Sequence, residues 1–120
     1  MSGYNPSFGR SMTEEEYCNE WIKSSEAYGR GGYYSWLCQR LEPIGDVLEI
    51  GCGAGNSTIS LLKNANTVTS VDVNSSCVTH ARTLVSREEG HEKCEIRQLD
   101  VFSDDVQEML SGKIFNTVTL

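Results

Sequence analysis

The strongest constraint on the fold is a short aliphatic segment followed by three glycines at alternate positions. Residues 46–50 have the composition of a β-strand, and Gly51, Gly53 and Gly55 follow directly. A helix is predicted over residues 56–64. Glycine tolerates positive φ and lets a ligand approach the backbone, and the first turn of a helix has unpaired N–H groups. The segment therefore predicts a strand, a ligand-binding turn and a helix in succession.

The spacing of the glycines separates two kinds of ligand. The dinucleotide fingerprint G-x-G-x-x-G needs a glycine where this chain has Asn56. A carboxylate, Glu49, stands two residues before Gly51 and would repel an anionic diphosphate. These residues favour a cationic ligand, and an NAD- or FAD-binding domain is kept as a remote alternative.

The rest of the chain alternates strands and helices. Further strands are predicted over residues 67–73, 94–99 and 114–120. Helices are predicted from residue 75 and over residues 104–110. Alternation at this spacing implies right-handed crossovers and a parallel sheet, so the predicted fold class is α/β.

Two helices are predicted before the first strand. Thr13 and Glu16 form a capping box that begins the first helix, and the glycines within residues 29–32 end it. The second helix is predicted to stop at Pro43. Its apolar side chains are expected to point toward the core, namely Tyr33, Trp36, Leu37 and Leu41.

The glycine-rich segment resembles the first motif of the class I (Rossmann-like) S-adenosylmethionine-dependent methyltransferases, which has the form of residues 49–55. In that family the loop packs under the methionine and ribose portions of the cofactor. The resemblance implies that Asp72, at the end of the second strand, accepts the ribose hydroxyls. It implies that Asp100, at the end of the third strand, accepts from the adenine amino group. Val73 and Val101 would flank the adenine.

The resemblance also implies a Rossmann-like three-layer sandwich with a parallel sheet of strand order 3-2-1-4, the first four of the family's seven strands. We expect residues 45–120 to be the cofactor-binding half of a methyltransferase domain. Residues 1–44 would form an N-terminal arm and helices. Groups that touch the methyl acceptor follow the fourth strand in this family, so the domain is expected to be truncated and no catalytic residue is assigned.

The predicted cofactor-binding residues combine these motif positions with an aromatic segment before the first strand. In this family the corresponding region often closes over the methionine end of the cofactor, which makes Tyr28 and Arg30 candidates for its sulfonium and carboxylate. The full set is Tyr28, Arg30, Glu49, Gly51, Cys52, Gly53, Gly55, Asp72, Val73, Asp100 and Val101.

Simpler roles stay open for several of these residues. Glu49 can hold the loop by accepting backbone N–H groups. Asp72 and Asp100 can cap the helices that follow them. Cys52 can be a small packing residue, since no histidine base stands near it in the sequence.

Composition argues against several other classes of protein. The chain has 10 Lys and Arg against 17 Asp and Glu, a net charge of −7, and lacks the basic cluster that binds nucleic-acid phosphates. No apolar run reaches the roughly 18 residues of a membrane span. The five cysteines lack zinc-site spacing, which favours reduced thiols and no metal. The first residues lack a signal-peptide pattern, so a cytoplasmic protein is expected.

These features support one principal hypothesis: the chain is the S-adenosylmethionine-binding portion of a methyltransferase that acts on an unidentified small-molecule or protein acceptor. The alternative is a non-catalytic module that assembles through its fourth strand. That strand is predicted to be an unpaired edge, which a second copy of the chain or a further segment would cover. Its apolar residues are Ile114, Phe115, Val118 and Leu120.

Overall fold

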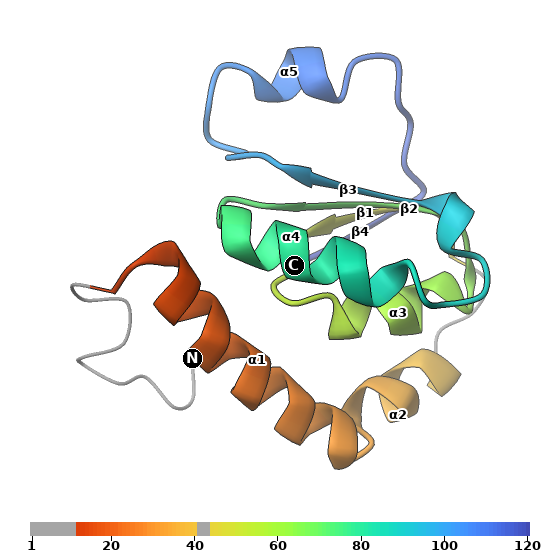
Figure 1. Cartoon of the computed structure of the whole chain (residues 1–120). Coiled ribbons are helices and arrows are strands. Elements are labelled where there is room, and N and C mark those ends of the chain that lie inside the picture. The colour runs from red at the N-terminus through yellow and green to blue at the C-terminus, as the bar shows by residue number, and fades with distance from the viewer. Residues whose placement is uncertain (1–11, 41–43) are drawn as a thin grey trace.

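A four-stranded parallel sheet organises the structure, a computed structural model that describes residues 12–40 and 44–120. The strands are β1 (Gly45–Ile50), β2 (Ala65–Asp72), β3 (Cys94–Gln98) and β4 (Thr117–Thr119). They pair in the order β3-β2-β1-β4, so the predicted topology is confirmed (Figure 1). Because every pair is parallel, the carboxyl ends of the strands meet at one edge of the sheet.

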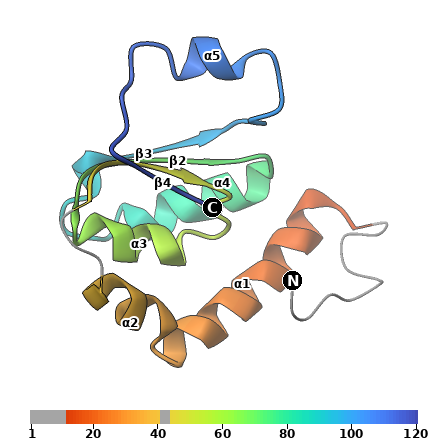
Figure 2. The same ribbon diagram turned by 180° about the vertical axis from the view of Figure 1, so that it is seen from behind.

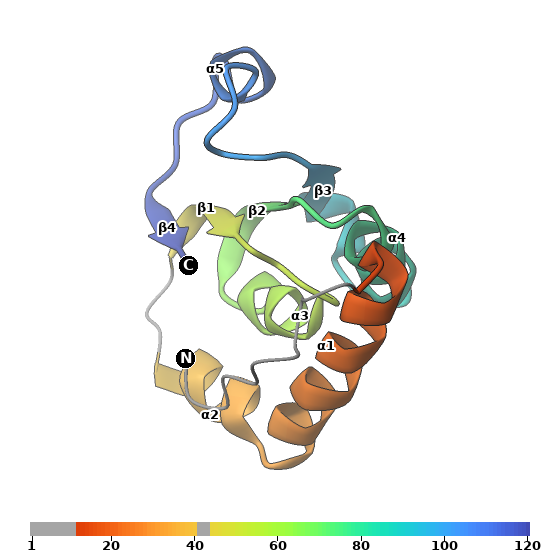
Figure 3. The ribbon, with the colours of Figure 1, turned by 90° about the vertical axis from the view of Figure 1, so that its left-hand side faces the viewer.

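Helices lie on both faces of the sheet. α3 (Asn56–Leu62) and α4 (Ser75–Val85) lie on one face, and the short α5 (Val106–Met109) lies on the other (Figures 2 and 3). A single 3-10 turn, η1 (His91–Lys93), leads from α4 to β3. This is the predicted three-layer order. The α5 layer is thin, because it consists of a four-residue helix in which no residue is buried.

The hydrophobic core lies between the sheet and the helices α3 and α4. Val47 of β1 is paired with Val68 of β2, and both are almost completely buried. They belong to one apolar cluster with Leu61 of α3 and with Val78 and Ala81 of α4. Burying an aliphatic side chain of this size contributes about 1.5–3 kcal/mol. The cluster therefore fixes the strand ends and helix starts that surround the glycine turn.

Two further helices precede the sheet, α1 (Glu14–Arg30) and α2 (Tyr33–Arg40). The Thr13 hydroxyl accepts a hydrogen bond from the backbone N–H of Glu16 at 3.1 Å, which confirms the predicted start of α1. Gly31 caps the carboxyl end of α1, again as predicted. α1 packs on α4 and α3, and α2 packs on α3, so both lie on the α3–α4 side of the sheet (Figure 3).

Polar contacts fasten α1 to the starts of α4 and α3. The Glu14 carboxylate accepts hydrogen bonds from the Ser75 hydroxyl and, at 2.9 Å, from the Ser75 backbone N–H. These bonds lower the pKa of Glu14, which is therefore ionised at neutral pH. The Asn74 side chain donates to the Glu14 carbonyl at 3.0 Å, and the Asn56 side chain donates to the Ser25 hydroxyl at 2.9 Å. Both ends of α1 are thus held beside the glycine turn.

The predicted inward face of α2 is wrong. Tyr33 and Trp36 are about half exposed, at 50% and 51%, and Leu37 is exposed as well. The physical reason is that α2 is a short helix that packs mainly on α1 and α3, which leaves much of its surface uncovered. Leu41 and Pro43 lie outside the described residues.

The last predicted strand is shorter in the structure than in the sequence analysis. β4 pairs with β1 only through residues 117–119. Just before β4, Asn116 bonds to β1 without extending the strand. Its backbone N–H donates to the Asp46 carbonyl at 2.8 Å, and its side-chain oxygen accepts from the Asp46 N–H at 2.9 Å. β4 is an edge strand, and Ile114, Val118 and Leu120 are exposed as predicted.

Replacing Asn74 with alanine tests how α1 and α4 are joined. The Asn74 side chain accepts from the Cys77 N–H at 3.0 Å, which caps α4, and also donates to Glu14. We expect Asn74→Ala to lower the free energy of unfolding in urea by about 1–2 kcal/mol. Thr83→Ala, at an exposed position of α4, should change it by less than about 0.5 kcal/mol. Equal losses in the two variants would contradict the capping role.

Candidate functional site

The turn after β1 places its three glycines at positive φ, namely 81°, 54° and 97° for Gly51, Gly53 and Gly55. A side chain at Gly53 would collide with the indole of Trp21, and a Cβ at Gly55 would lie 3.1 Å from Ala81 of α4. Nothing lies within 4 Å of a Cβ built on Gly51. Gly53 and Gly55 therefore permit close packing, while Gly51 leaves the backbone open to a ligand.

Glu49, at the end of β1, is a buried carboxylate that joins three elements. It is only 4% exposed. Its oxygens accept hydrogen bonds from the hydroxyls of Ser57 and Thr58 on α3, at 2.6 and 2.5 Å, and from Ser70 on β2 at 2.8 Å. The bonds come from side-chain hydroxyls rather than from the backbone N–H groups considered in the sequence analysis. Because a buried carboxylate without hydrogen-bond partners is costly, these three hydroxyls are what make the burial of Glu49 possible.

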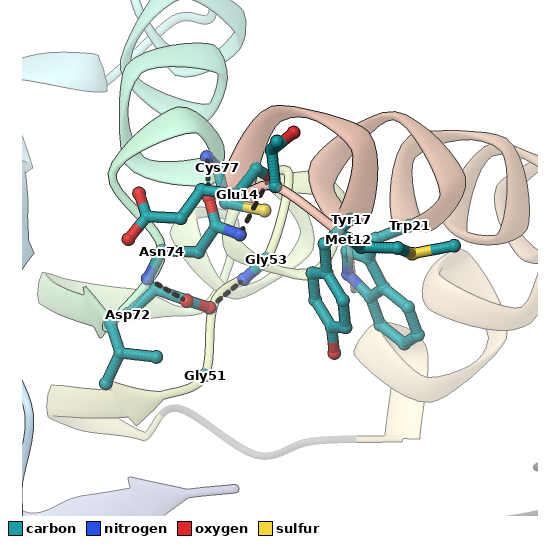
Figure 4. Close-up of a pocket in the computed structure, with 11 residues that line it drawn as sticks. Met12, Glu14, Tyr17, Trp21, Gly51, Gly53, Asp72, Asn74 and Cys77 are labelled. Carbon is teal, nitrogen blue, oxygen red and sulfur yellow. Dashed lines mark hydrogen bonds between the residues drawn. The ribbon is translucent and has the colours of Figure 1, made fainter. Parts of the chain in front are cut away.

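Asp72, the last residue of β2, braces the glycine turn. One carboxylate oxygen accepts from the Gly53 N–H and the other from the Asn74 N–H, both at 2.9 Å (Figure 4). Each oxygen of an ionised carboxylate has a second acceptor site, so capacity for a ligand hydroxyl remains. Asn74 is the residue that caps α4, so the alternative of Asp72 as a helix cap is wrong.

Cavity A lies between α1 and the carboxyl ends of β1 and β2. Its volume is about 430 Å³. Its lining includes Tyr17, Trp21, Gly51, Gly53, Asp72 and Val73. Tyr17 and Trp21 project from α1 on one side, and the Asp72 carboxylate lies across from them (Figure 4). Glu14 also lines it, so cavity A combines aromatic and apolar surface with two acidic groups, a composition typical of small-molecule sites.

Cavity B lies between α1, α2, α3 and the carboxyl ends of β1 and β4. It has a volume of about 630 Å³. Its lining includes Trp21, Tyr28, Tyr33, Tyr34, Glu49 and Gly51. The rings of Tyr33 and Tyr34 meet edge to face with centroids 5.4 Å apart, and Tyr28 is tilted against Tyr33 at 6.0 Å. Burial, then the neighbouring Tyr33 and Glu49, raise the pKa of Tyr34, so its phenol is neutral at physiological pH.

Gly51 and Trp21 line both cavities. The open backbone of Gly51 is therefore a point over which an elongated ligand could extend from one cavity to the other. The Glu49 carboxylate would then lie toward one end of that ligand and Asp72 toward the other.

The predicted site residues divide into two groups. Those that line a cavity are Gly51, Gly53, Asp72 and Val73 in cavity A, and Tyr28, Glu49 and Gly51 in cavity B. The remaining five, Arg30, Cys52, Gly55, Asp100 and Val101, are not among the lining residues of either cavity.

Asp100 and Val101 lie just beyond β3, next to the end of β2. The Leu99 N–H donates to the Asp72 carbonyl at 3.0 Å, so the two strand ends are adjacent. The Asp100 carboxylate accepts from the Phe102 N–H at 2.9 Å within its own turn. Asp105, and not Asp100, occupies the cap position of α5, so the helix-cap alternative for Asp100 is wrong.

The other three residues outside the cavities have different surroundings. Cys52 is 3% exposed within the core cluster, and burial, followed by the charges of Glu49 and Asp72, raises the pKa of its thiol. It is therefore a packing residue, and its thiol is protonated at neutral pH. Gly55 packs on α4, and Arg30 is exposed in the last turn of α1.

The sequence analysis missed Trp21 and Tyr17 as site residues. Gly53 was a clue, because a glycine in a packed turn allows a bulky neighbour to approach, but no sequence signal identified that neighbour as Trp21.

A metal-binding cluster and a membrane-spanning helix are both absent from residues 12–40 and 44–120. These residues contain no group of three or more His, Cys, Asp or Glu side chains placed to hold a metal ion. Among the same residues, no helix combines the length and apolar character needed to cross a bilayer.

Comparison with known proteins gives the family. The sequence profile of a methyltransferase domain matches residues 47–119, which include the glycine turn, Asp72 and Asp100. The chain belongs to this methyltransferase domain family. No curated protein sequence shows significant similarity to it.

Solved structures agree with the family. DhpI, in a complex described as DhpI–SAM–HEP, is 26% identical with a TM-score of 0.57, over 74% of this chain and 40% of that one. The glycopeptide N-methyltransferase MtfA, complexed with S-adenosylmethionine, is 25% identical with a TM-score of 0.53, over 71% and 36%. The N-methyltransferase NodS of Bradyrhizobium japonicum shares the fold, at 22% identity and a TM-score of 0.54, over 75% and 42%. The chain thus spans less than half the length of each of these three.

The buried carboxylate network can be tested by substitution. We expect Glu49→Ala to lower the free energy of unfolding by about 2–4 kcal/mol, because it leaves three hydroxyls without their acceptor and opens a void. Glu92→Ala is the matched control, since the Glu92 side chain is 71% exposed, and its effect should stay below about 0.5 kcal/mol. Urea denaturation measures both, and a small effect for Glu49→Ala would show that the network contributes little.

Proposed function

We propose that this chain binds S-adenosylmethionine across cavities A and B and forms the donor-binding part of a methyltransferase. The observation that carries the proposal is the open Gly51 backbone, which lines both cavities between the Asp72 and Glu49 carboxylates. S-adenosylmethionine is elongated, with a diol-bearing adenosine at one end and a cationic methionine portion at the other. Cavity A has a carboxylate, Asp72, that suits the diol of the adenosine. Cavity B has a carboxylate, Glu49, and aromatic rings that suit the cationic methionine portion.

The adenosine end fits cavity A. The Asp72 carboxylate has acceptor capacity for the ribose hydroxyls, and the exposed Val73 side chain offers an apolar surface beside it. Asp100 and Val101 follow β3 next to Asp72, where they would accept from the adenine amino group and pack on the ring. Ligand sites of open α/β sheets lie at this carboxyl edge.

The methionine end fits cavity B. The Glu49 carboxylate favours a positive charge, and the Tyr28 ring can face the sulfonium. Arg30, two residues beyond Tyr28 in the last turn of α1, is proposed to meet the methionine carboxylate. In this arrangement the transferable methyl group points into cavity B.

The proposed reaction needs alignment more than acid–base chemistry. The sulfonium supplies an already activated methyl carbon when the cofactor is bound. The chain's own residues hold that donor and exclude water around it, which is the main source of acceleration for such a displacement. DhpI and the glycopeptide N-methyltransferase MtfA support this assignment, since both are described in complex with S-adenosylmethionine. The whole protein would act in the cytoplasm on a small-molecule or protein acceptor.

A second candidate function is assembly through β4. Ile114 is 84% exposed and Leu120 is 97% exposed, so the edge strand offers apolar surface to a second copy of the chain or to another segment. Light scattering over a range of protein concentrations measures whether the chain self-associates and so tests this candidate function. A monomer at every concentration would count against self-association through β4.

The dinucleotide alternative has one specific observation against it. Asn56 stands where the fingerprint needs glycine, and its side chain donates to the buried Ser25 hydroxyl of α1. The residue that departs from the fingerprint is therefore part of the contact between α1 and α3.

Isothermal titration calorimetry with S-adenosylmethionine and S-adenosylhomocysteine tests the proposal. We expect both to bind and NADH not to compete. Asp72→Ala should weaken binding by about 1.5–3 kcal/mol, because it removes a charged acceptor. Asp46→Ala is the matched control, since Asp46 begins β1 at the opposite edge of the sheet and should leave affinity unchanged. Absence of binding heat from both ligands, or equal affinities for the two variants, would contradict the proposal.

A further inference from the structure

The lining of cavity B has an unusual balance of charge. It contains four aromatic side chains, those of Trp21, Tyr28, Tyr33 and Tyr34, together with the Glu49 carboxylate. Among the residues that the structure describes, 12–40 and 44–120, no lysine, arginine or histidine lines this cavity. The face of an aromatic ring carries negative electrostatic potential, so rings and carboxylate act in the same direction. The cavity is therefore complementary to a positively charged group.

The tyrosines are arranged to enclose a compact group rather than to fill the space themselves. Tyr28 and Tyr33 are each 50% exposed, with their rings inclined at 54° to one another. Tyr33 and Tyr34 are inclined at 70°. Rings that are tilted in this way present surfaces in several directions, which suits a roughly spherical ammonium better than a flat ring.

The charge of the cavity distinguishes between kinds of methyl acceptor. When an amine nitrogen donates its lone pair to the methyl carbon, the carbon–sulfur bond breaks and its electron pair stays on sulfur. The positive charge then passes from sulfur to nitrogen. With an anionic oxygen acceptor, the charge instead disappears in the transition state. A cavity complementary to a cation stabilises both the transition state and the product of methyl transfer to an amine. It does not stabilise the product of transfer to an anionic oxygen, because that product carries no positive charge.

We propose that the part of cavity B lined by Tyr33 and Tyr34 is the acceptor site, and that the acceptor is an amine whose methylated product is a cationic ammonium held by these two rings. This inference rests on the proposed donor site, because the methyl group must point into cavity B. A tertiary amine reacts without loss of a proton. A primary or secondary amine releases one proton to water after transfer.

Choline and its neutral isostere 3,3-dimethylbutan-1-ol test the site, because they share shape and differ in charge. Both are titrated into the chain and followed by proton NMR, in the presence and absence of saturating S-adenosylhomocysteine. We expect choline to bind about fivefold more tightly than the isostere, and to bind alongside S-adenosylhomocysteine. Tyr33→Leu and Tyr34→Leu should each weaken choline binding about two- to fivefold.

Trp36→Leu is the matched control. Trp36 is a half-exposed aromatic residue on the same helix as Tyr33, lies against Arg40 and is not among the residues that line cavity B. It should leave choline affinity unchanged, and circular dichroism melting confirms that all three variants fold.

Three results would overturn the proposal. Equal binding of the isostere would show that charge is not recognised, and insensitivity to both tyrosine substitutions would place choline elsewhere. Complete displacement of choline by S-adenosylhomocysteine would assign the tyrosines to the donor. Calorimetry can also show no binding of S-adenosylhomocysteine while choline binding still depends on the tyrosines. That result would contradict both the proposed donor site and the acceptor role, and would show that cavity B is a cation site only.

Discussion

The buried Glu49 carboxylate is the interaction on which the rest of the site depends. It lies near the end of β1, accepts hydrogen bonds from hydroxyls on α3 and β2, and lines cavity B. One side chain thus links the sheet, the helix after the glycine turn and cavity B. Satisfying that carboxylate with three hydroxyls fixes how α3 leaves β1. The turn between them then presents Gly51, and Asp72 braces the same turn from β2.

α1 completes the site from outside the sheet. Glu14 and Ser25 hold it to α4 and α3, and Trp21 lies against Gly53 between the two cavities. Trp21 of this helix therefore lines both of the cavities that the proposed donor would span.

Much of the fold could be predicted because the signals are local. Strand composition, glycine spacing and the Thr13 cap predicted the element order, whereas the strand order 3-2-1-4 and the role of Asp72 were predicted from the resemblance to the methyltransferase family. The remainder depended on tertiary packing. The exposure of Tyr33 and Trp36 followed from how little covers α2, and the contact of Trp21 with Gly53 joins segments with no shared sequence signal. Glu49 was identified as a site residue, but its hydroxyl partners become neighbours only when α3 and β2 pack around it.

The most direct test of the central claim is a crystal structure of the chain with S-adenosylhomocysteine. The account predicts the ribose hydroxyls within hydrogen-bonding distance of the Asp72 carboxylate, the sulfur beside Gly51, and the amino acid end directed toward Glu49 and Tyr28. Tyr33 and Tyr34 should remain open to a second molecule. A nucleoside bound away from Asp72, or a ligand that reaches only one of the two cavities, would contradict it.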